Sequence, residues 1–176
     1  MTLSTTTPAR PADPLLDPAR LLAVAAATSS STTGGPVQAC LDVLVQRAAS
    51  GLPAGSAVAV NLVWHDVLFI LAGHGLPPQV SQIGGMPLEW ALCGLVIRDQ
   101  APLLVDDTQA RPEHALPDGA MCAFRSYAGV PLRDPAGQWV GTFVATHPEP
   151  GAFGRAEMAV LTVMAGYAEG ALFTAP

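Results

Sequence analysis

The sequence predicts an α+β fold in which an antiparallel sheet carries helices on one side. Three observations indicate this class. Apolar side chains recur with helical spacing after Pro36, they alternate between residues 57 and 64, and a strand-turn-strand pattern runs from Ala123 to Phe153. With 176 residues, half of them hydrophobic, the chain is long enough to bury a sizeable core in one domain.

The N-terminal part predicts a disordered lead and two helices. Residues 1–13 are rich in Thr and Pro, so the folded domain is expected over 14–176. Asp17-Pro18 supplies an N-cap and a first-turn proline for a helix of about a dozen residues. The second helix begins at Pro36 and ends at Ser50-Gly51. Its expected apolar face consists of Val37, Cys40, Leu41, Leu44, Val45 and Ala48.

The middle of the chain predicts three strands and a short helix. In the first strand, alternation puts Val58, Val60, Leu62 and Trp64 on one side and Ala57, Ala59, Asn61 and Val63 on the other. A second strand follows His65-Asp66 over residues 67–72, and 102–106 form a third. Met86 to Cys93 are expected to form a short helix that Pro87 starts and Gly94 stops. Residues 108–121 are an irregular loop.

The C-terminal part predicts a hairpin and a long helix. Ser126–Leu132 and Gln138–Thr146 are the strands, and Pro135 and Gly137 favour a tight reversal between them. The second strand is expected to place Val140, Thr142 and Val144 on one face and Trp139, Phe143 and Ala145 on the other. Gly154 to Leu172 have helical apolar spacing.

Composition excludes several classes of function. All eight basic residues are Arg, and without Lys the chain cannot form a P-loop, a pyridoxal Schiff base or a kinase ATP site. Scattered Arg residues and a net charge of −6 argue against nucleic-acid binding. No apolar run approaches the roughly 20 residues of a membrane helix, so no membrane association is expected. Three widely spaced Cys residues indicate reduced thiols and a cytoplasmic location.

The sequence resembles the GAF domain family over residues 35–172. The resemblance rests on residues 126–132 (SYAGVPL), Gly137, Gly141 and the helix after Phe153, and it extends to residues 95–97 and 102–107. It implies a sheet of about five to six strands, flanked by the N- and C-terminal helices on one side and by a short helix plus loops on the other. It also implies a small-molecule-sensing module without catalytic activity.

The segments that line the pocket in similar proteins correspond to Trp90, Cys93, Asp107, His114, Cys122, Phe124, Arg125 and Tyr127. Each of these residues also has a purely structural explanation, such as a buried thiol at Cys93 or a solvated loop histidine at His114. Gly129 and Gly141, inside strands, either admit a ligand near the backbone or ease close packing. The His residues have no Cys or His at ligand-like spacing, so no metal site is expected.

The specialised branches of the family leave the ligand unknown. Bilin-carrying relatives usually have His after the attachment Cys, whereas Ala123 follows Cys122. The cyclic-nucleotide signature of the family contains Lys, which this chain lacks. Free methionine sulfoxide reductases share the fold and use pocket cysteines, so a thiol-dependent reductase with Cys93 and Cys122 is the alternative function. Their Ser-Glu-Ile entry into the strand is replaced here by Arg125-Ser126-Tyr127.

Two apolar helices predict oligomerisation. Leu21 to Ala27 are apolar nearly all round, and the last helix is apolar over more than half of its circumference. One sheet face cannot cover both, so we expect a homodimer through the first and last helices. Its surface would relay the state of the ligand to a signalling partner protein.

Overall fold

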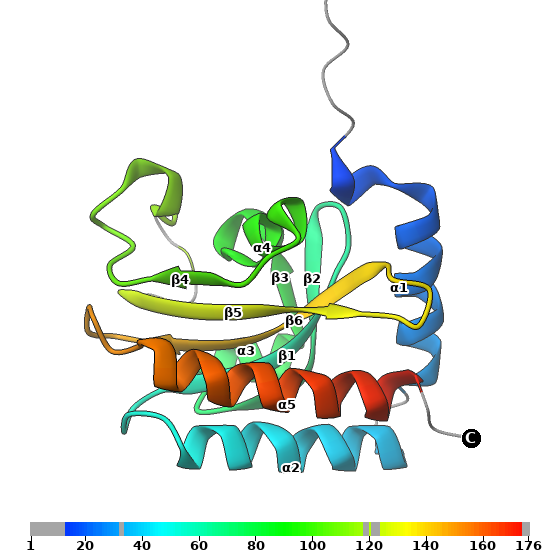
Figure 1. Ribbon diagram of the computed structural model, residues 1–176, viewed down its shortest axis with the longest axis horizontal. Helices are drawn as coiled ribbons and strands as arrows, with labels where there is room; N and C mark the ends of the chain where they lie inside the picture. Colours follow the sequence, from blue (N-terminus) through cyan, green and yellow to red (C-terminus); the bar gives the residue numbers. More distant parts are fainter. Residues whose placement is uncertain (1–12, 32–33, 118–119, 121–123, 174–176) are drawn as a thin grey trace, which may run out of the picture.

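The computed structural model describes residues 13–31, 34–117, 120 and 124–173. Its centre is a six-stranded sheet in the order β3-β2-β1-β6-β5-β4, in which all neighbouring strands are antiparallel. The strands are β1 (Ala57–Val63), β2 (Val67–His74), β3 (Gly85–Pro87), β4 (Leu103–Val105), β5 (Ser126–Arg133) and β6 (Trp139–His147). The predicted α+β class and antiparallel sheet are confirmed (Figure 1).

Helices cover both faces of this sheet. The α-helices are α1 (Pro18–Ser30), α2 (Pro36–Ser50), α3 (Pro78–Ile83), α4 (Cys93–Asp99) and α5 (Arg155–Phe173), and the 3-10 turns are η1 (Pro14–Leu16), η2 (Leu88–Trp90) and η3 (Pro112–His114). The helices α2 and α5 lie side by side on one face, whereas α4 lies on the other (Figure 1). The sheet therefore separates two apolar cores, one under α2 and α5 and one under α4 and η2.

The N-terminal helix is fastened to the sheet by a buried arginine. Asp17 caps α1 by accepting a hydrogen bond from the Ala19 amide, 3.1 Å away. Arg20 then turns inward and donates to the carbonyl oxygens of Leu15 and Val63. Burial lowers the pKa of Arg20 to about 10, which still leaves the guanidinium charged at neutral pH. Apart from Asp13, the predicted lead lies outside the described residues.

The predicted bounds of the second helix are confirmed, because α2 extends from Pro36 to Ser50. Its apolar face differs from the prediction at one residue. The buried side chains are Val37, Leu41, Leu44, Val45 and Ala48. Cys40 is exposed instead, because at 100° per residue it falls at the edge of the stripe that these five residues form.

The region around Pro87 corrects the prediction of a helix over Met86–Cys93. Met86 instead pairs with β2 as part of β3, because a proline disfavours helical backbone at the residue before it. A 3-10 turn follows, and α4 only begins at Cys93. Gly94, predicted to end a helix, lies in the first turn of α4. The helix α3 and the strand β3 are also absent from the predicted elements.

A β-bulge moves two side chains of β6 to the opposite faces from those predicted. Leu132 pairs with Gly141 and Arg133 pairs with Trp139, so Val140 is an extra residue on β6. Val140 therefore joins the core under α5, and Trp139 packs against the core under α4. Beyond the bulge, and along β1, the predicted alternation of faces is confirmed.

Among the described residues, α5 is the helix long and apolar enough to cross a membrane by length and composition, with a mean hydropathy of 1.2. It packs on the sheet instead, and its buried stripe consists of Leu161, Ala165, Ala168 and Leu172. These buried apolar residues of α5 are therefore part of the protein core. Val163 and Tyr167, on its outer side, are exposed.

Candidate functional site

A small cavity of about 50 Å³ lies in the core between the sheet and η2 and α4. Strand residues supply most of its walls, and the chain around η2 and α4, Leu76 after β2 and Phe124 before β5 supply the rest. Among the described residues, its lining contains no charged side chain and consists of Ala57, Ala59, Asn61, Leu68, Ile70, Leu76, Met86, Trp90, Ala91, Cys93, Phe124, Tyr127, Val144 and Thr146. Four predicted site residues, Trp90, Cys93, Phe124 and Tyr127, therefore share one cavity.

The polar floor of this cavity is built around the thiol of Cys93. The Asn61 Nδ2 donates to Cys93 Sγ across 3.7 Å, and the Tyr127 hydroxyl donates across 3.6 Å. Burial raises the pKa of the Cys93 thiol, and the polar side chains of Thr142, Tyr127 and Asn61 beside it only partly offset this rise. Burial and the neighbouring thiol also raise the pKa of Tyr127 well above its usual value. At neutral pH the whole floor is uncharged.

Two polar atoms beside this thiol have no hydrogen-bond partner among the described residues. They are Asn61 Oδ1 and Thr142 Oγ1, and both residues are buried. Asn61 and Thr142 are direct cross-strand partners in the β1–β6 ladder, so their side chains lie next to each other on one face of the sheet. Asn61 also lines the cavity, so the side chain with this unpartnered oxygen borders the space that a bound molecule would occupy.

The two strand glycines serve packing. A Cβ on Gly129 would lie 2.4 Å from the hydroxyl of Tyr127, so the missing side chain makes room for the ring that reaches Cys93. A Cβ on Gly141 would lie 2.0 Å from the backbone carbonyl oxygen of Asn61. Gly141 therefore permits the close approach of the two central strands, and Gly129 contributes to the cavity only through Tyr127.

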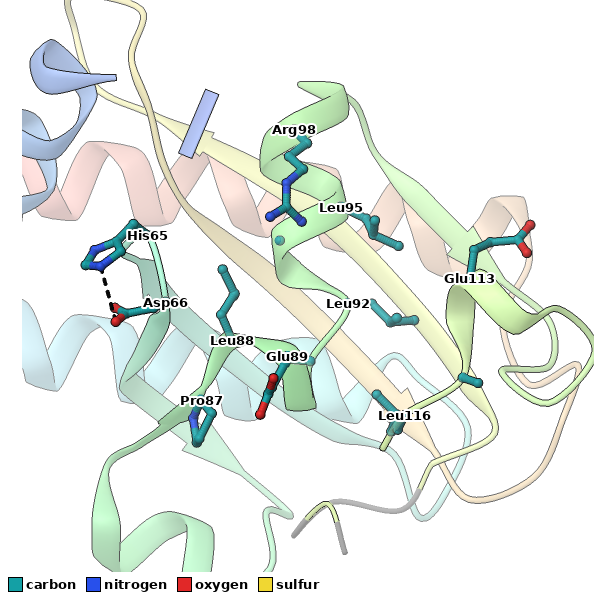
Figure 2. Close-up of a pocket in the computed structure, with 13 residues that line it drawn as sticks. His65, Asp66, Pro87, Leu88, Glu89, Leu92, Leu95, Arg98, Glu113 and Leu116 are labelled. Carbon is teal, nitrogen blue, oxygen red and sulfur yellow. Dashed lines mark ion pairs between the residues drawn. The ribbon is translucent and has the colours of Figure 1, made fainter. Parts of the chain in front are cut away.

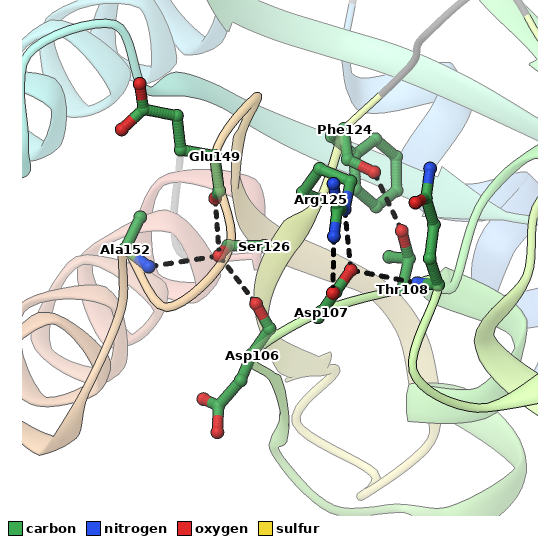
Figure 3. A network of polar contacts seen from close by, with 9 residues as sticks. Asp106, Asp107, Thr108, Phe124, Arg125, Ser126, Glu149 and Ala152 are labelled. Atoms are coloured by element: carbon green, nitrogen blue, oxygen red, sulfur yellow. Dashed lines mark hydrogen bonds and ion pairs between the residues drawn. The ribbon is translucent and has the colours of Figure 1, made fainter.

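Asp107 and Arg125 form an ion pair at the base of the loop that leads into β5. Arg125 Nε and Nη2 donate to the two carboxylate oxygens of Asp107 across 2.7 and 2.5 Å (Figure 3). The Arg125 hydrogen bonds hold the pKa of Asp107 at about 2. Thr108 adds a hydrogen bond from its hydroxyl to the Phe124 carbonyl oxygen. The pair thus fastens both ends of the loop and does not line the cavity.

Ser126 joins three segments at the start of β5. Its hydroxyl oxygen lies 3.0 Å from the Asp106 carbonyl oxygen and 2.8 Å from that of Glu149, and it accepts a hydrogen bond from the Ala152 amide (Figure 3). A hydroxyl has one proton, so it donates to one of the two carbonyl oxygens at a time. The serine links β4, β5 and the segment before α5.

A larger open cleft of about 490 Å³ lies outside the cavity, between the β1–β2 turn, η2, α4 and the η3 loop (Figure 2). Leucines from η2, α4 and the loop form its apolar part, and charged side chains surround them. Two pairs already form among these side chains and their neighbours: His65 contacts Asp66, and Arg98 forms an ion pair with Asp13. The cleft contains none of the predicted site residues, so we take the cavity at Cys93 as the candidate site.

The remaining two predicted residues lie elsewhere. His114 lies at the C-terminal end of η3 and lines a surface hollow together with Asp107. It therefore does not share a cavity with Cys93. Cys122 is outside the described residues. Among those that are described, no three His, Cys, Asp or Glu side chains gather into a group suited to a metal ion.

Comparison with known proteins identifies the family of this fold. A sequence model of the GAF domain matches residues 36–172. The chain belongs to the GAF domain family. No curated protein sequence gives a significant match.

Solved structures with this GAF fold include both sensor domains and enzymes. The GAF domain of a phosphoenolpyruvate-protein phosphotransferase from Coxiella burnetii is 19% identical, with a TM-score of 0.65 over 87% of this chain and 92% of its own. The type II free methionine-R-sulfoxide reductase from Thermoplasma acidophilum is 18% identical, with a TM-score of 0.63 over 77% and 92%. The free methionine-R-sulfoxide reductase from Neisseria meningitidis is 19% identical, with a TM-score of 0.61 over 84% and 83%. At these identities the likeness shows the fold alone.

Sequence reasoning missed the most informative polar residue of this GAF cavity, which is Asn61. A signal for it was present, because an asparagine on the predicted Ala57-Ala59-Val63 face is the polar exception on an otherwise apolar side of a strand. Thr142 lies directly opposite Asn61 on β6. Alternation along the strand places it on one face but predicts no part for it in the site.

Proposed function

We propose that this GAF domain is a non-catalytic sensor that binds a small uncharged molecule in the cavity at Cys93. The observation that carries the proposal is the chemistry of the lining, which among the described residues is apolar or neutral throughout. Burying an unpaired ionic group in such a site costs several kcal/mol or more. At about 50 Å³ the cavity is below the range of roughly 300–1,000 Å³ for drug-sized ligands. The ligand is therefore a few-atom molecule, or it enters with movement of the walls.

Movement of one wall is the simpler route for anything larger. Met86, which lines the cavity, has a flexible unbranched side chain that adapts its shape more easily than branched residues do. Leu76, in the loop after β2, is only partly buried against the same core. These two side chains are the ones whose rotation would enlarge the cavity at the least cost.

A thiol-dependent reductase remains the second candidate, because Cys93 lies at the cavity floor of a fold that also occurs in reductases. Two observations weigh against it. The raised pKa keeps the thiol protonated, whereas the thiolate is the nucleophile. Free methionine sulfoxide is a zwitterion at neutral pH, and the described lining offers neither of its charges a partner.

A binding experiment with matched variants tests the sensor proposal. A fragment library would be screened by NMR against the parent protein, against Ala57→Leu, which adds bulk at the cavity wall, and against Ala159→Leu on the exposed side of α5. We expect hits that Ala57→Leu weakens and Ala159→Leu retains. Hits that both variants bind equally well would place the binding elsewhere and contradict the proposal. An absorption spectrum of protein purified from its host separately checks for a coloured cofactor.

An activity assay tests the reductase. Free methionine-R-sulfoxide would be supplied with a dithiol reductant, and turnover would be compared among the parent, Cys93→Ser and Cys122→Ser. We expect the parent protein to show no more turnover than the two variants. Turnover by the parent that either substitution abolishes would establish the enzyme and reject the sensor proposal.

The same proposal includes a homodimer that relays the state of the ligand to a signalling partner protein in the cytoplasm. Its support is the exposure of large apolar side chains on the first and last helices, 73% for Leu22 and 63% for Tyr167. Val43 of α2, the helix beside α5, is 58% exposed. Light scattering of Tyr167→Glu and Leu22→Glu distinguishes the helices, since the one that forms the interface yields monomers on substitution. A monomeric parent protein would refute the dimer.

A further inference from the structure

The cavity has a hydrogen-bonding polarity that restricts its ligand further. We propose that the ligand is an uncharged molecule with an apolar body and an N–H or O–H group, which donates a hydrogen bond to Asn61 Oδ1. This inference rests on the proposed binding function and names the chemical class of the ligand.

The first step is an account of the donors at the floor. Asn61 Nδ2 and the Tyr127 hydroxyl both donate to Cys93 Sγ, so this contact uses the hydroxyl proton of Tyr127 and one of the two N–H groups of Asn61. The thiol and the phenol stay neutral because burial raises both of their pKa values. Among the described residues, the floor therefore offers no positively charged group to an anion.

The second step is the acceptor that is left over. Asn61 is 3% exposed, and its Oδ1 has no hydrogen-bond partner among the described residues. An amide oxygen buried without a partner costs about 1–3 kcal/mol, and that cost is recovered when a donor arrives. In the structure the amide turns Nδ2 towards the sulfur of Cys93, which leaves Oδ1 as the atom without a partner.

The third step concerns the rest of the lining. Trp90 and Thr146, its other polar side chains, are only half-buried, so the unmet demand for a hydrogen bond lies with Asn61. The other described residues that line the cavity have aliphatic or aromatic side chains. Among them, the rings of Phe124 and Tyr127 stack with their centroids 5.9 Å apart. A molecule with an apolar body and one donor matches this arrangement, and a charged molecule does not.

Pyrrole and furan test the inference as a matched pair. Both are five-membered rings of nearly the same size, but pyrrole has an N–H donor and furan has only a weak acceptor. Each would be titrated into the parent protein at millimolar concentration, and the backbone amide signals of the cavity residues would be followed by ¹H–¹⁵N NMR. We expect pyrrole to bind roughly five- to tenfold more tightly than furan, which corresponds to about 1–1.4 kcal/mol from one buried hydrogen bond.

Variants assign the preference to one oxygen. Asn61→Leu replaces the amide by an apolar group of similar shape, and we expect it to reduce the pyrrole-to-furan ratio to about one or below. Ala159→Leu, on the exposed side of α5 and outside the lining, leaves Asn61 Oδ1 in place, and we expect it to keep the preference for pyrrole. If Asn61→Leu does not fold, the ratio in the parent protein still decides.

The outcomes separate this inference from the proposed function. Equal or tighter binding of furan by the parent protein would overturn the inference, since a resident water would then satisfy Asn61, and the binding function would stand. A preference for pyrrole that survives in Asn61→Leu would also overturn it. If neither compound shifts the signals of the cavity residues, the cavity does not take up small molecules, and both proposals fail.

Discussion

Gly129→Ala is the substitution whose effect on the cavity follows most directly from the structure. The added Cβ would lie 2.4 Å from the Tyr127 hydroxyl oxygen, where an ordinary contact is about 3.4 Å, so the ring must move by roughly 1 Å. That movement lengthens the contact between the hydroxyl and Cys93 Sγ, now 3.6 Å, beyond hydrogen-bonding range.

The expected cost has two parts. Overpacking of a core costs about 1–3 kcal/mol, and a buried hydroxyl left without a partner costs about 1–3 kcal/mol, so Gly129→Ala should destabilise by about 2–6 kcal/mol. Urea denaturation followed by tryptophan fluorescence measures the loss. The same variant should weaken ligand binding in the cavity, because the displaced Tyr127 ring forms part of its wall.

A double-mutant cycle shows whether the clash is with Tyr127. Tyr127→Phe removes the hydroxyl that lies closest to the added methyl group, although ring carbons at 2.7 and 2.8 Å remain. Gly129→Ala should therefore cost less in the Tyr127→Phe background than in the parent, by at least about 0.5 kcal/mol. Additive effects, or a cost of Gly129→Ala below about 0.5 kcal/mol, would refute the packing role assigned to Gly129.

Three further predictions concern pH and backbone packing. The raised pKa of Cys93 contributes stability that is complete below the unfolded-state value of about 8.5–9 and is lost as pH rises towards the folded value, so urea midpoints should fall above about pH 9. Cys93→Ser should delay this fall, and Cys40→Ser, on the exposed side of α2, should not. The lowered pKa of Asp107 acts in the opposite direction, since its stabilisation is present above about pH 4 and is lost as pH falls towards 2; Asp107→Asn should remove that acid dependence in the same assay. Gly141→Ala should lower the yield of folded protein more than Gly129→Ala, because it drives a Cβ into strand backbone, and equal yields would contradict this.

The sequence was sufficient for the fold because local patterns and their spacing agree. Alternation along β1 correctly separated the two faces, and helical spacing after Pro36 gave the bounds of α2. The errors occur where a single residue changes the geometry. The bulge at Val140 exchanges faces without changing the apolar pattern, and Pro87 permits either a helix start or an extended strand. Pairing with a neighbouring strand decides the structure at both positions, and the spacing of apolar residues in the sequence carries no information about that pairing.

The site was predictable only in part, for a related reason. The resemblance predicts Trp90, Cys93, Phe124 and Tyr127 as pocket residues, and these four line one cavity, but proximity in sequence to a pocket segment does not fix which way a side chain points. Arg125 precedes β5 by one residue and points away from the cavity, towards Asp107. Alternation along the strand would put Arg125 on the same side as Tyr127, so its orientation follows from the ion pair with Asp107, the second residue after β4.

The chemistry of the cavity follows from a conflict between burial and polarity. An apolar cavity would need no amide or hydroxyl group, and a catalytic thiol site would need a positive charge or a base beside Cys93 to lower its pKa. The structure instead places an asparagine and a tyrosine around the sulfur, both uncharged, and leaves one amide oxygen without a partner. Such a polar cluster costs stability unless something completes it. A cluster that cannot ionise and lacks one donor is better suited to the recognition of a neutral molecule than to the attack on a sulfoxide.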